Sequence, residues 1–240
     1  MRRSPVAGVD LLVYLRAVPL VLRNPVILVV PLLMAVIGVL VGQLMAPYGG
    51  GMLGYAAGGL GGLIQLLLMM FGVGAACIIA DDAWRHGSAS FDRGWEEARR
   101  RGGDILFAAI GFSLLLGVAQ YVGMLFGAIA YVIMALVFYF LIWALPAAAV
   151  GGIPGGAAIQ VSIDRVRSAP LVAGITAALA LAVMIAVAGY VPVAVTEWLL
   201  PYVPGTPIAG ALIAAVFQAI ALGYIAAIIT KTYTAAAFVR

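Results

Sequence analysis

The chain has 240 residues, of which 65% are hydrophobic and 9% are charged, and its mean hydropathy is +1.18. Soluble domains carry roughly 25% charged residues, so this composition excludes an ordinary soluble domain. The net charge of +4 comes from basic residues that we expect to contact anionic lipid at a membrane surface, with no role in nucleic-acid binding. Long runs rich in Leu, Ala, Ile and Met, without the alternation of β-strands, predict an all-α polytopic integral membrane protein.

The first 24 residues form an arm that we expect to lie in the membrane interface. Arg16 and Arg23 are seven residues apart, so on a helix they share a face that apolar side chains flank. Pro25 disfavours a helical conformation at Asn24, which predicts a bend before the first span.

Six hydrophobic stretches are long enough to cross a bilayer, which takes about 20 residues per helix. No charged residue lies between Asp104 and Asp164, and this stretch is long enough for two crossings joined by a tight turn. We therefore predict one transmembrane domain over residues 1–240 with six spans, at about residues 25–46, 58–80, 104–123, 126–150, 171–193 and 207–230.

Residues 81–104 form the main charged loop between the second and third predicted spans. They include five of the thirteen basic residues, six of the nine acidic residues, the only histidine and two of the four tryptophans. With six spans, every lysine and arginine falls on the side of the two termini, and the opposite loops hold only Glu197. Basic residues are enriched in cytoplasmic loops, so we expect a multi-pass protein of the cell (inner) membrane with both termini in the cytoplasm.

A charged and partly amphipathic segment precedes a pair of spans three times: YLRAVPLVLRNP, FDRGWEEARRRGGD and IQVSIDRVRSAP. In the second segment, Phe91, Trp95 and Ala98 have the helical spacing of an apolar stripe. Two pairs of opposite charge in this segment have the i,i+4 spacing with the glutamate first: Glu96–Arg100 and Glu97–Arg101. We therefore predict amphipathic interfacial helices on the cytoplasmic face, each followed by a transmembrane hairpin, in a threefold repeat.

This pattern is similar to that of a group of bacterial six-span membrane proteins, and it resembles the membrane domain attached to some glycerophosphodiester phosphodiesterases. The likeness rests on the Arg-Asn-Pro and Arg-Ser-Ala-Pro entries to the spans, on the spacing of the hairpins, and on Gly94, Trp95, Ala98 and Arg101. It implies the six-span architecture. It does not imply catalysis, because the soluble phosphodiesterase domain that would carry the chemistry is absent from this sequence.

Asp81, Asp82 and His86 lie close together in the sequence, and Asp82 and His86 are four residues apart on one helical face. Two carboxylates and an imidazole can bind a divalent metal ion. The alternative is a solvated helix end that Trp84 anchors at the interface. We favour this alternative, because no second cluster of ligands completes a site, and we predict neither a metal nor a cofactor.

The run from Glu96 to Gly102, EEARRRG, resembles the E-A-A-x-x-x-G loop by which importer permeases of the ATP-binding-cassette class dock their ATPase. Glu97 stands where that loop has alanine, and the downstream Leu-Pro is missing, so a charged amphipathic helix is the favoured interpretation. The resemblance implies Glu96, Glu97 and Gly102 as a docking loop. It also gives the alternative function, a permease-like membrane component of a small-molecule or lipid transporter.

No Asp, Glu, Lys, Arg or His lies well inside a predicted span, which argues against a proton-coupled pump. The polar residues that remain in the spans are expected to form hydrogen bonds between helices: Gln43, Gln65, Ser113, Gln120, Thr176 and Gln218. The sequence has no nucleophile elbow, P-loop or Rossmann fingerprint, so we do not expect an enzyme.

Together these features predict a non-catalytic membrane protein that acts as a scaffold or accessory subunit. Its basic cytoplasmic face would bind anionic lipid head groups, a partner membrane protein or a second copy of the chain. The residues that we expect to make these contacts are Trp84, Arg85, Arg93, Trp95, Arg99, Arg100, Arg101, Arg165 and Arg167.

Overall fold

The computed structural model describes residues 10–45, 51–127, 129–199 and 207–236. Most of the predicted N-terminal arm before Asp10, including Arg2 and Arg3, and the C-terminal Arg240 lie outside the described residues. Within the described ranges every regular element is a helix. In chain order the helices are α1 (Leu12–Arg23), α2 (Val26–Met45), α3 (Gly51–His86), α4 (Phe91–Arg100), α5 (Gly102–Met124), α6 (Ile129–Leu141), α7 (Ala144–Ala149), α8 (Gly155–Ser168), α9 (Pro170–Val183), the π-helix η2 (Met184–Tyr190), α10 (Val191–Leu199) and α11 (Pro207–Ala236).

Six helical segments are long and apolar enough to cross a membrane: Val26–Leu44, Gly59–His86, Gly102–Gly123, Tyr131–Ala149, Pro170–Leu199 and Ile208–Ala236. The predicted all-α fold of a polytopic membrane protein is therefore confirmed at this level. The second span is longer than predicted, because α3 continues beyond Ala80 to His86. The first six residues of the predicted charged loop are helical as a result.

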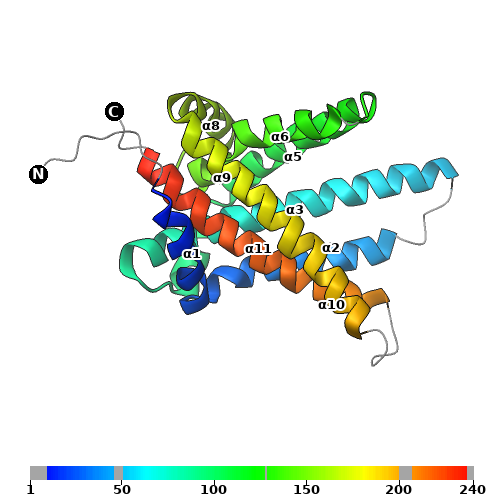
Figure 1. Ribbon diagram of the computed structural model, residues 1–240, viewed down its shortest axis with the longest axis horizontal. Coiled ribbons are helices and arrows are strands. Elements are labelled where there is room, and N and C mark those ends of the chain that lie inside the picture. The colour runs from blue at the N-terminus through cyan, green and yellow to red at the C-terminus, as the bar shows by residue number, and fades with distance from the viewer. Residues whose placement is uncertain (1–9, 46–50, 128, 200–206, 237–240) are drawn as a thin grey trace, which may run out of the picture.

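The six spans form three antiparallel hairpins that diverge from one end of the molecule (Figure 1). The short helices α1, α4 and α8, one before each hairpin, lie at this end together with the C-terminal part of α11. Apart from Glu197, the charged residues of the described ranges belong to this end, which we call the charged end. The location of the short helices in a membrane interface and the threefold repeat stay predictions.

Helix α11 lies in the middle of the bundle and packs against α1, α2, α3, α7, α9, η2 and α10. Helices α3 and α11 run parallel, and the Thr230 hydroxyl of α11 donates a hydrogen bond to the Cys77 carbonyl of α3 at 3.5 Å. Small residues allow such close packing between spans. A Cβ atom on Gly74 of α3 would lie only 2.5 Å from Cγ2 of Ile105 on α5, so this helix crossing requires glycine.

The predicted fourth span is not one continuous helix, because α6 ends at Leu141 and α7 begins at Ala144. The Ser162 hydroxyl of α8 lies at this break. It donates a hydrogen bond to the Phe140 carbonyl at 2.8 Å, and it accepts one from the Trp143 N–H at 3.1 Å. A side chain that enters the backbone hydrogen-bond ladder is a recognised cause of a helix kink. The break turns α7 into the core, where all six of its residues are buried.

The fifth span contains the π-helix η2 between α9 and α10. Pro192, the second residue of α10, has no N–H, and in a regular α-helix its ring would clash with the carbonyl of Ala188, four residues earlier. The wider π-helical turns immediately precede this proline and increase the room for its ring. We therefore attribute η2 to Pro192.

Asn24 joins α1, α2 and the turn between α3 and α4. It is not helical (φ −125°, ψ 67°), as Pro25 predicts, and its side chain is buried. The side-chain amide donates a hydrogen bond to the Leu20 carbonyl at 3.0 Å, and its oxygen accepts one from the Ala89 N–H at 2.8 Å. This buried amide therefore sets where α4 begins relative to α1 and α2.

Candidate functional site

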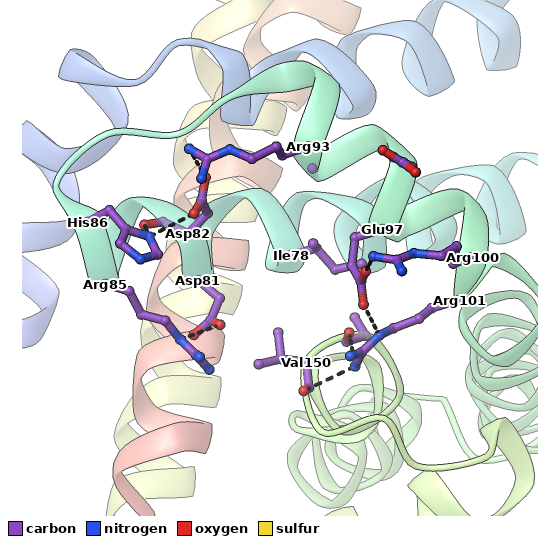
Figure 2. A pocket seen from close by; sticks show the side chains of 13 residues that line it. Ile78, Asp81, Asp82, Arg85, His86, Arg93, Glu97, Arg100, Arg101 and Val150 are labelled. Atoms are coloured by element: carbon purple, nitrogen blue, oxygen red, sulfur yellow. Dashed lines mark hydrogen bonds and ion pairs between the residues drawn. The ribbon is translucent and has the colours of Figure 1, made fainter.

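A polar cavity of about 450 Å³ opens at the charged end (Figure 2). The end of α3, one side of α4, and Ala149 and Val150 at the C-terminal end of α7 form its walls. Four carboxylates, four guanidinium groups and His86 line it, and we call it the charged pocket. The sequence singled out most of these side chains, but did not predict that they enclose a cavity.

The α3 wall of the charged pocket carries two adjacent aspartates with different partners. Asp81 forms an ion pair with Nε of Arg85 at 2.8 Å. Asp82 Oδ1 lies 2.8 Å from Nδ1 of His86, while its other oxygen lies 3.5 Å from Arg93 of α4. Asp82 therefore links the end of α3 to the start of α4.

The α4 wall is organised by Glu97. Its carboxylate accepts a hydrogen bond from Nε of Arg101 at 2.6 Å and also forms an ion pair with Arg100. The predicted Glu97–Arg101 pair is therefore confirmed, and Arg100 pairs with this same glutamate, not with Glu96 as the i,i+4 spacing predicts. Partial burial acts to raise the pKa of Glu97, but the hydrogen bonds and charges of Arg101 and Arg100 outweigh it and lower that pKa below its usual value.

Arg101 also closes the third wall of the pocket. Its Nη1 donates hydrogen bonds to the carbonyl oxygens of Ala149 at 3.0 Å and Val150 at 3.2 Å. The last carbonyls of a helix have no partner within the helix, so a cation at this position satisfies and stabilises the end of α7. Arg101 thus joins α4, α5 and α7, and Figure 2 shows its guanidinium between Glu97 and Val150.

The carboxylates and the guanidinium groups lie at different depths in the charged pocket. The side chains of Asp81, Asp82 and Glu97 are 17%, 18% and 26% exposed. Those of the arginines at the edge are 63%, 67% and 70% exposed, for Arg85, Arg93 and Arg100 respectively. Two groups depart from this trend: Glu96 is exposed, and Arg101, which is 33% exposed, lies beside Glu97. The pocket therefore has a mainly acidic interior that also holds one guanidinium, and a mainly basic rim.

The three residues of the apolar stripe predicted on α4 differ in burial. Ala98 is buried with Gly94, whose added Cβ would lie 2.6 Å from Cγ1 of Ile79 on α3. Phe91 and Trp95 instead stack on each other, with ring centroids 6.0 Å apart, and remain 36% and 37% exposed. Phe91, Trp95 and Ala98 have the predicted helical spacing. Helix α4 packs against α3 through Gly94 and Ala98, however, and this leaves the two aromatic rings at the edge of the contact.

The other residues predicted to bind lipid or a partner are spread over several helices. Trp84 donates a hydrogen bond to the Ala227 carbonyl of α11 at 3.0 Å, and the Lys231 ammonium lies 5.3 Å from its ring centroid. Arg165 donates a hydrogen bond to the Tyr233 carbonyl at 2.7 Å and stacks over the Tyr233 ring. These two side chains hold the helices together. Arg99 and Arg167 are exposed on α4 and α8 and lie outside the charged pocket.

The residues weighed as metal ligands, Asp81, Asp82 and His86, all line the charged pocket, and Asp82 contacts His86. Within the described ranges, no group of three or more His, Cys, Asp and Glu side chains is placed to hold a metal ion. In the docking-loop segment, Glu97 pairs with two arginines in the charged pocket, Glu96 also lines the pocket but is exposed, and Gly102 begins α5.

Two of the polar residues in the spans, Thr176 and Gln218, form the predicted hydrogen bonds between helices. The Thr176 hydroxyl of α9 lies 2.9 Å from the Tyr14 hydroxyl of α1, and the Gln218 amide of α11 donates to the Met69 sulfur of α3 at 3.1 Å. The Ser113 hydroxyl is buried without a hydrogen-bond partner.

The sequence predicted the bend at Asn24, but it did not predict three sets of contacts that shape this end of the molecule: those of the Asn24 side chain, of Ser162, and of Arg101 with α7. The Asn-Pro dipeptide is a turn signal that marks Asn24. The partners of Ser162 and Arg101 lie 19 or more residues away in the chain, and local patterns do not identify them.

Comparisons of the chain with protein-family models, with curated proteins and with solved structures found no match. The resemblance to the membrane domain of glycerophosphodiester phosphodiesterases therefore rests on the sequence pattern alone and stays a prediction.

Proposed function

We propose that this chain is a non-catalytic polytopic membrane protein, a scaffold or accessory subunit, whose charged end lies in the cytoplasm and binds anionic lipid head groups. The surface that would do so is formed by the outer sides of α1 and α4. The observation that carries the proposal is the distribution of side chains around α1.

Helix α1 has three distinct sides. One side is buried on the bundle, where the Tyr14 hydroxyl meets Thr176 and the Tyr14 carbonyl accepts a hydrogen bond from Tyr224 at 3.1 Å. A second side carries an exposed apolar stripe with helical spacing: Leu11, Leu15, Val18 and Leu22. The third side carries the exposed Arg16 and Arg23.

This distribution matches a helix that lies in the plane of a membrane interface. Such a helix buries an apolar side at the boundary of the acyl chains and directs basic residues to the head groups. Contacts with α9 and α11 fix the orientation of α1, so its leucine stripe is a fixed outer surface of the bundle.

Helix α4 supports the same interpretation. The stacked rings of Phe91 and Trp95 are partly exposed, and Arg99 follows Trp95 by one helical turn on the same side. Aromatic side chains are favoured at the head-group level, and basic residues near an anionic surface add electrostatic attraction. We call Leu11, Leu15, Val18, Leu22, Phe91 and Trp95 with Arg16, Arg23 and Arg99 the outer basic face.

Retention of anionic lipid tests the proposal. The protein would be placed in nanodiscs that contain phosphatidylglycerol and phosphatidylcholine. Native mass spectrometry would then release the protein from the nanodiscs and identify the lipids that stay bound to it. We expect Arg16, Arg23 and Arg99, replaced together by Gln, to reduce the retained phosphatidylglycerol several-fold. The matched control replaces Arg85, Arg93 and Arg100 of the pocket rim by Gln, which removes the same number of charges from the same end.

Arg85, Arg93 and Arg100 pair with carboxylates of the charged pocket, so, unlike the wider set of lipid contacts expected from the sequence, the present proposal has the control variant keep its phosphatidylglycerol. Equal losses in both variants would mean that net charge alone matters, and no loss in the first variant would also reject the outer basic face. Reporter fusions at the C-terminus test the cytoplasmic orientation, and a reporter active only outside the cytoplasm would reject it.

Purification from native membranes in a mild detergent tests the other predicted partners. A co-purifying ATPase that is lost on Glu96→Ala or Gly102→Trp would favour the permease-like alternative and reject the scaffold. A stable complex with a different membrane protein, or with a second copy of the chain, would support the scaffold or accessory role.

A further inference from the structure

We propose that the charged pocket binds a small zwitterion that carries a primary ammonium group and a phosphate a few bonds apart. The ammonium would lie in the interior near Asp81 and Glu97, and the phosphate would lie at the rim near Arg85 and Arg100. This site is separate from the outer basic face, so the inference goes beyond the proposed function and does not depend on it.

The depth of the charges is the first argument. Asp81 and Glu97 come from different helices, and Figure 2 shows them on two sides of the cavity with their oxygens directed inward from α3 and α4. The guanidinium groups of Arg85 and Arg100 stand farther out and are mostly exposed. A ligand that enters from solvent therefore meets positive charge first and negative charge behind it.

The backbone adds to the negative interior. Ala149 and Val150 line the pocket at the C-terminal end of α7, where the helix dipole is negative. Arg101 binds the carbonyl oxygens of both residues and also Glu97, so its charge is already shared among three acceptors. The interior therefore favours a cation that can donate several hydrogen bonds, as a primary ammonium does.

Simpler ligands fit less well. A bare anion such as phosphate is attracted by the rim but repelled by the carboxylates and by the end of α7. A bare cation is attracted by the interior but must pass three arginines. A zwitterion meets complementary charge at both depths, and the cavity of about 450 Å³ falls in the range of roughly 300–1,000 Å³ that is usual for small-molecule sites.

The rim arginines can also change partner at little cost. The Asp81–Arg85 and Glu97–Arg100 ion pairs each include an arginine whose side chain is mostly exposed. Exposed ion pairs of this kind contribute little to the stability of the fold. A phosphate oxygen can take the place of one carboxylate contact of the arginine, and the ammonium then pairs with the carboxylate that is freed. The number of opposite-charge contacts increases on binding.

Two sources supply this chemistry, a free metabolite and the head group of an aminophospholipid. Phosphoethanolamine is the probe for the first. The full-length protein in a maltoside detergent, which carries neither group, would be titrated with phosphoethanolamine, phosphate, ethanolamine and phosphocholine. We expect phosphoethanolamine to bind best, because a trimethylammonium group cannot donate hydrogen bonds to carboxylates.

Nanodiscs that contain phosphatidylethanolamine, phosphatidylglycerol and phosphatidylcholine test the lipid source, with native mass spectrometry as the readout. Asp81→Asn removes a charge from the interior at nearly constant size, and Arg85→Gln removes the guanidinium group from the rim. Each should weaken binding by about tenfold or more, as expected for the loss of a charged hydrogen bond. Asp164→Asn makes the same change as Asp81→Asn on the exposed surface of α8, and this variant should bind as the unchanged protein does.

Binding of phosphoethanolamine that is lost in the pocket variants alone supports the proposal with a soluble ligand. Selective retention of phosphatidylethanolamine, lost in the same variants, supports it with a lipid ligand. The proposal is overturned if phosphate or ethanolamine alone binds as well as the zwitterion, if the pocket variants bind normally, or if both arms show no binding. Circular dichroism and gel filtration would show that each variant is folded.

Discussion

Arg101 reaches across the charged end to the carbonyl oxygen of Ala149, 3.0 Å from its Nη1, and so connects the start of α5 to the last turn of α7. The same guanidinium binds Val150 and Glu97, which makes it the common partner of three segments. This side chain is one of three consecutive arginines in the sequence, yet its environment differs from that of its neighbours. Arg99 is exposed, and Arg100 is 70% exposed at the pocket rim.

Arg101→Gln should destabilise the protein more than Arg99→Gln, although both remove one positive charge from the same segment. The carbonyls of Ala149 and Val150 would lose their donor, at a cost of about 1–3 kcal/mol. Thermal unfolding in detergent, followed by tryptophan fluorescence, would measure the difference. Hydrogen exchange should increase at residues 147–153 in Arg101→Gln only. Equal unfolding temperatures for the two variants would mean that Arg101 does not hold α7.

Ser162→Ala should destabilise the break between α6 and α7. The buried hydroxyl satisfies the Phe140 carbonyl and the Trp143 N–H, and its removal leaves both groups without this partner at a cost of about 1–3 kcal/mol. Ser168→Ala is the control, because that hydroxyl lies at the exposed end of α8 and bonds only to the Arg165 carbonyl. Tryptophan emission should also shift, since Trp143 is fully buried at the break. A spectrum and stability like those of the control would contradict this role.

Gly94→Ala should displace α4 from α3. The added Cβ would lie 2.6 Å from Cγ1 of Ile79, and overpacking of this kind costs about 1–3 kcal/mol. Gly156→Ala on α8 is the matched control, because no atom lies within 4 Å of its added Cβ. Alanine is a better helix former than glycine, so the control should be neutral or more stable by up to about 1 kcal/mol. If Gly94→Ala were as stable as the control, this would contradict the close packing of α4 on α3 at Gly94.

Glu97 should make the stability of the charged end depend on pH in the acid range. Its folded-state pKa is lowered by Arg101 and Arg100 against the opposing effect of burial, so the folded state favours the ionised form. The stabilisation is therefore fully present above the ordinary glutamate pKa of about 4.3 and is lost as the pH falls through the lower folded-state value.

Glu97→Gln provides the comparison for this pH dependence. It should unfold at a lower temperature than the unchanged protein at pH 7, and the gap between the two should narrow as the pH falls below about 4. Melting curves from pH 7 to pH 3 would test this. A gap that stays constant over the whole range would show that ionisation of Glu97 does not stabilise the fold.

The helical class, the six spans and the gathering of charge at one end follow from local properties of the chain. Hydrophobic length and the positions of charges can be read directly from the sequence, so six helices long enough to cross a membrane could be predicted. The residues at which helices end were harder to predict from the sequence. The charges of Asp81 and Asp82 indicated a loop, but α3 continues through them because their side chains pair within the helix and with α4.

Only the tertiary structure decided what the individual side chains do. The spacing of Phe91, Trp95 and Ala98 places them on one side of a helix, but the packing of Gly94 on Ile79 determines which of them is buried. Arg99, Arg100 and Arg101 have the same chemistry, and their different surroundings depend on where α7 lies relative to α4. Contacts between distant segments, such as Ser162 with Trp143, arise from how whole helices pack, and no local pattern encodes them.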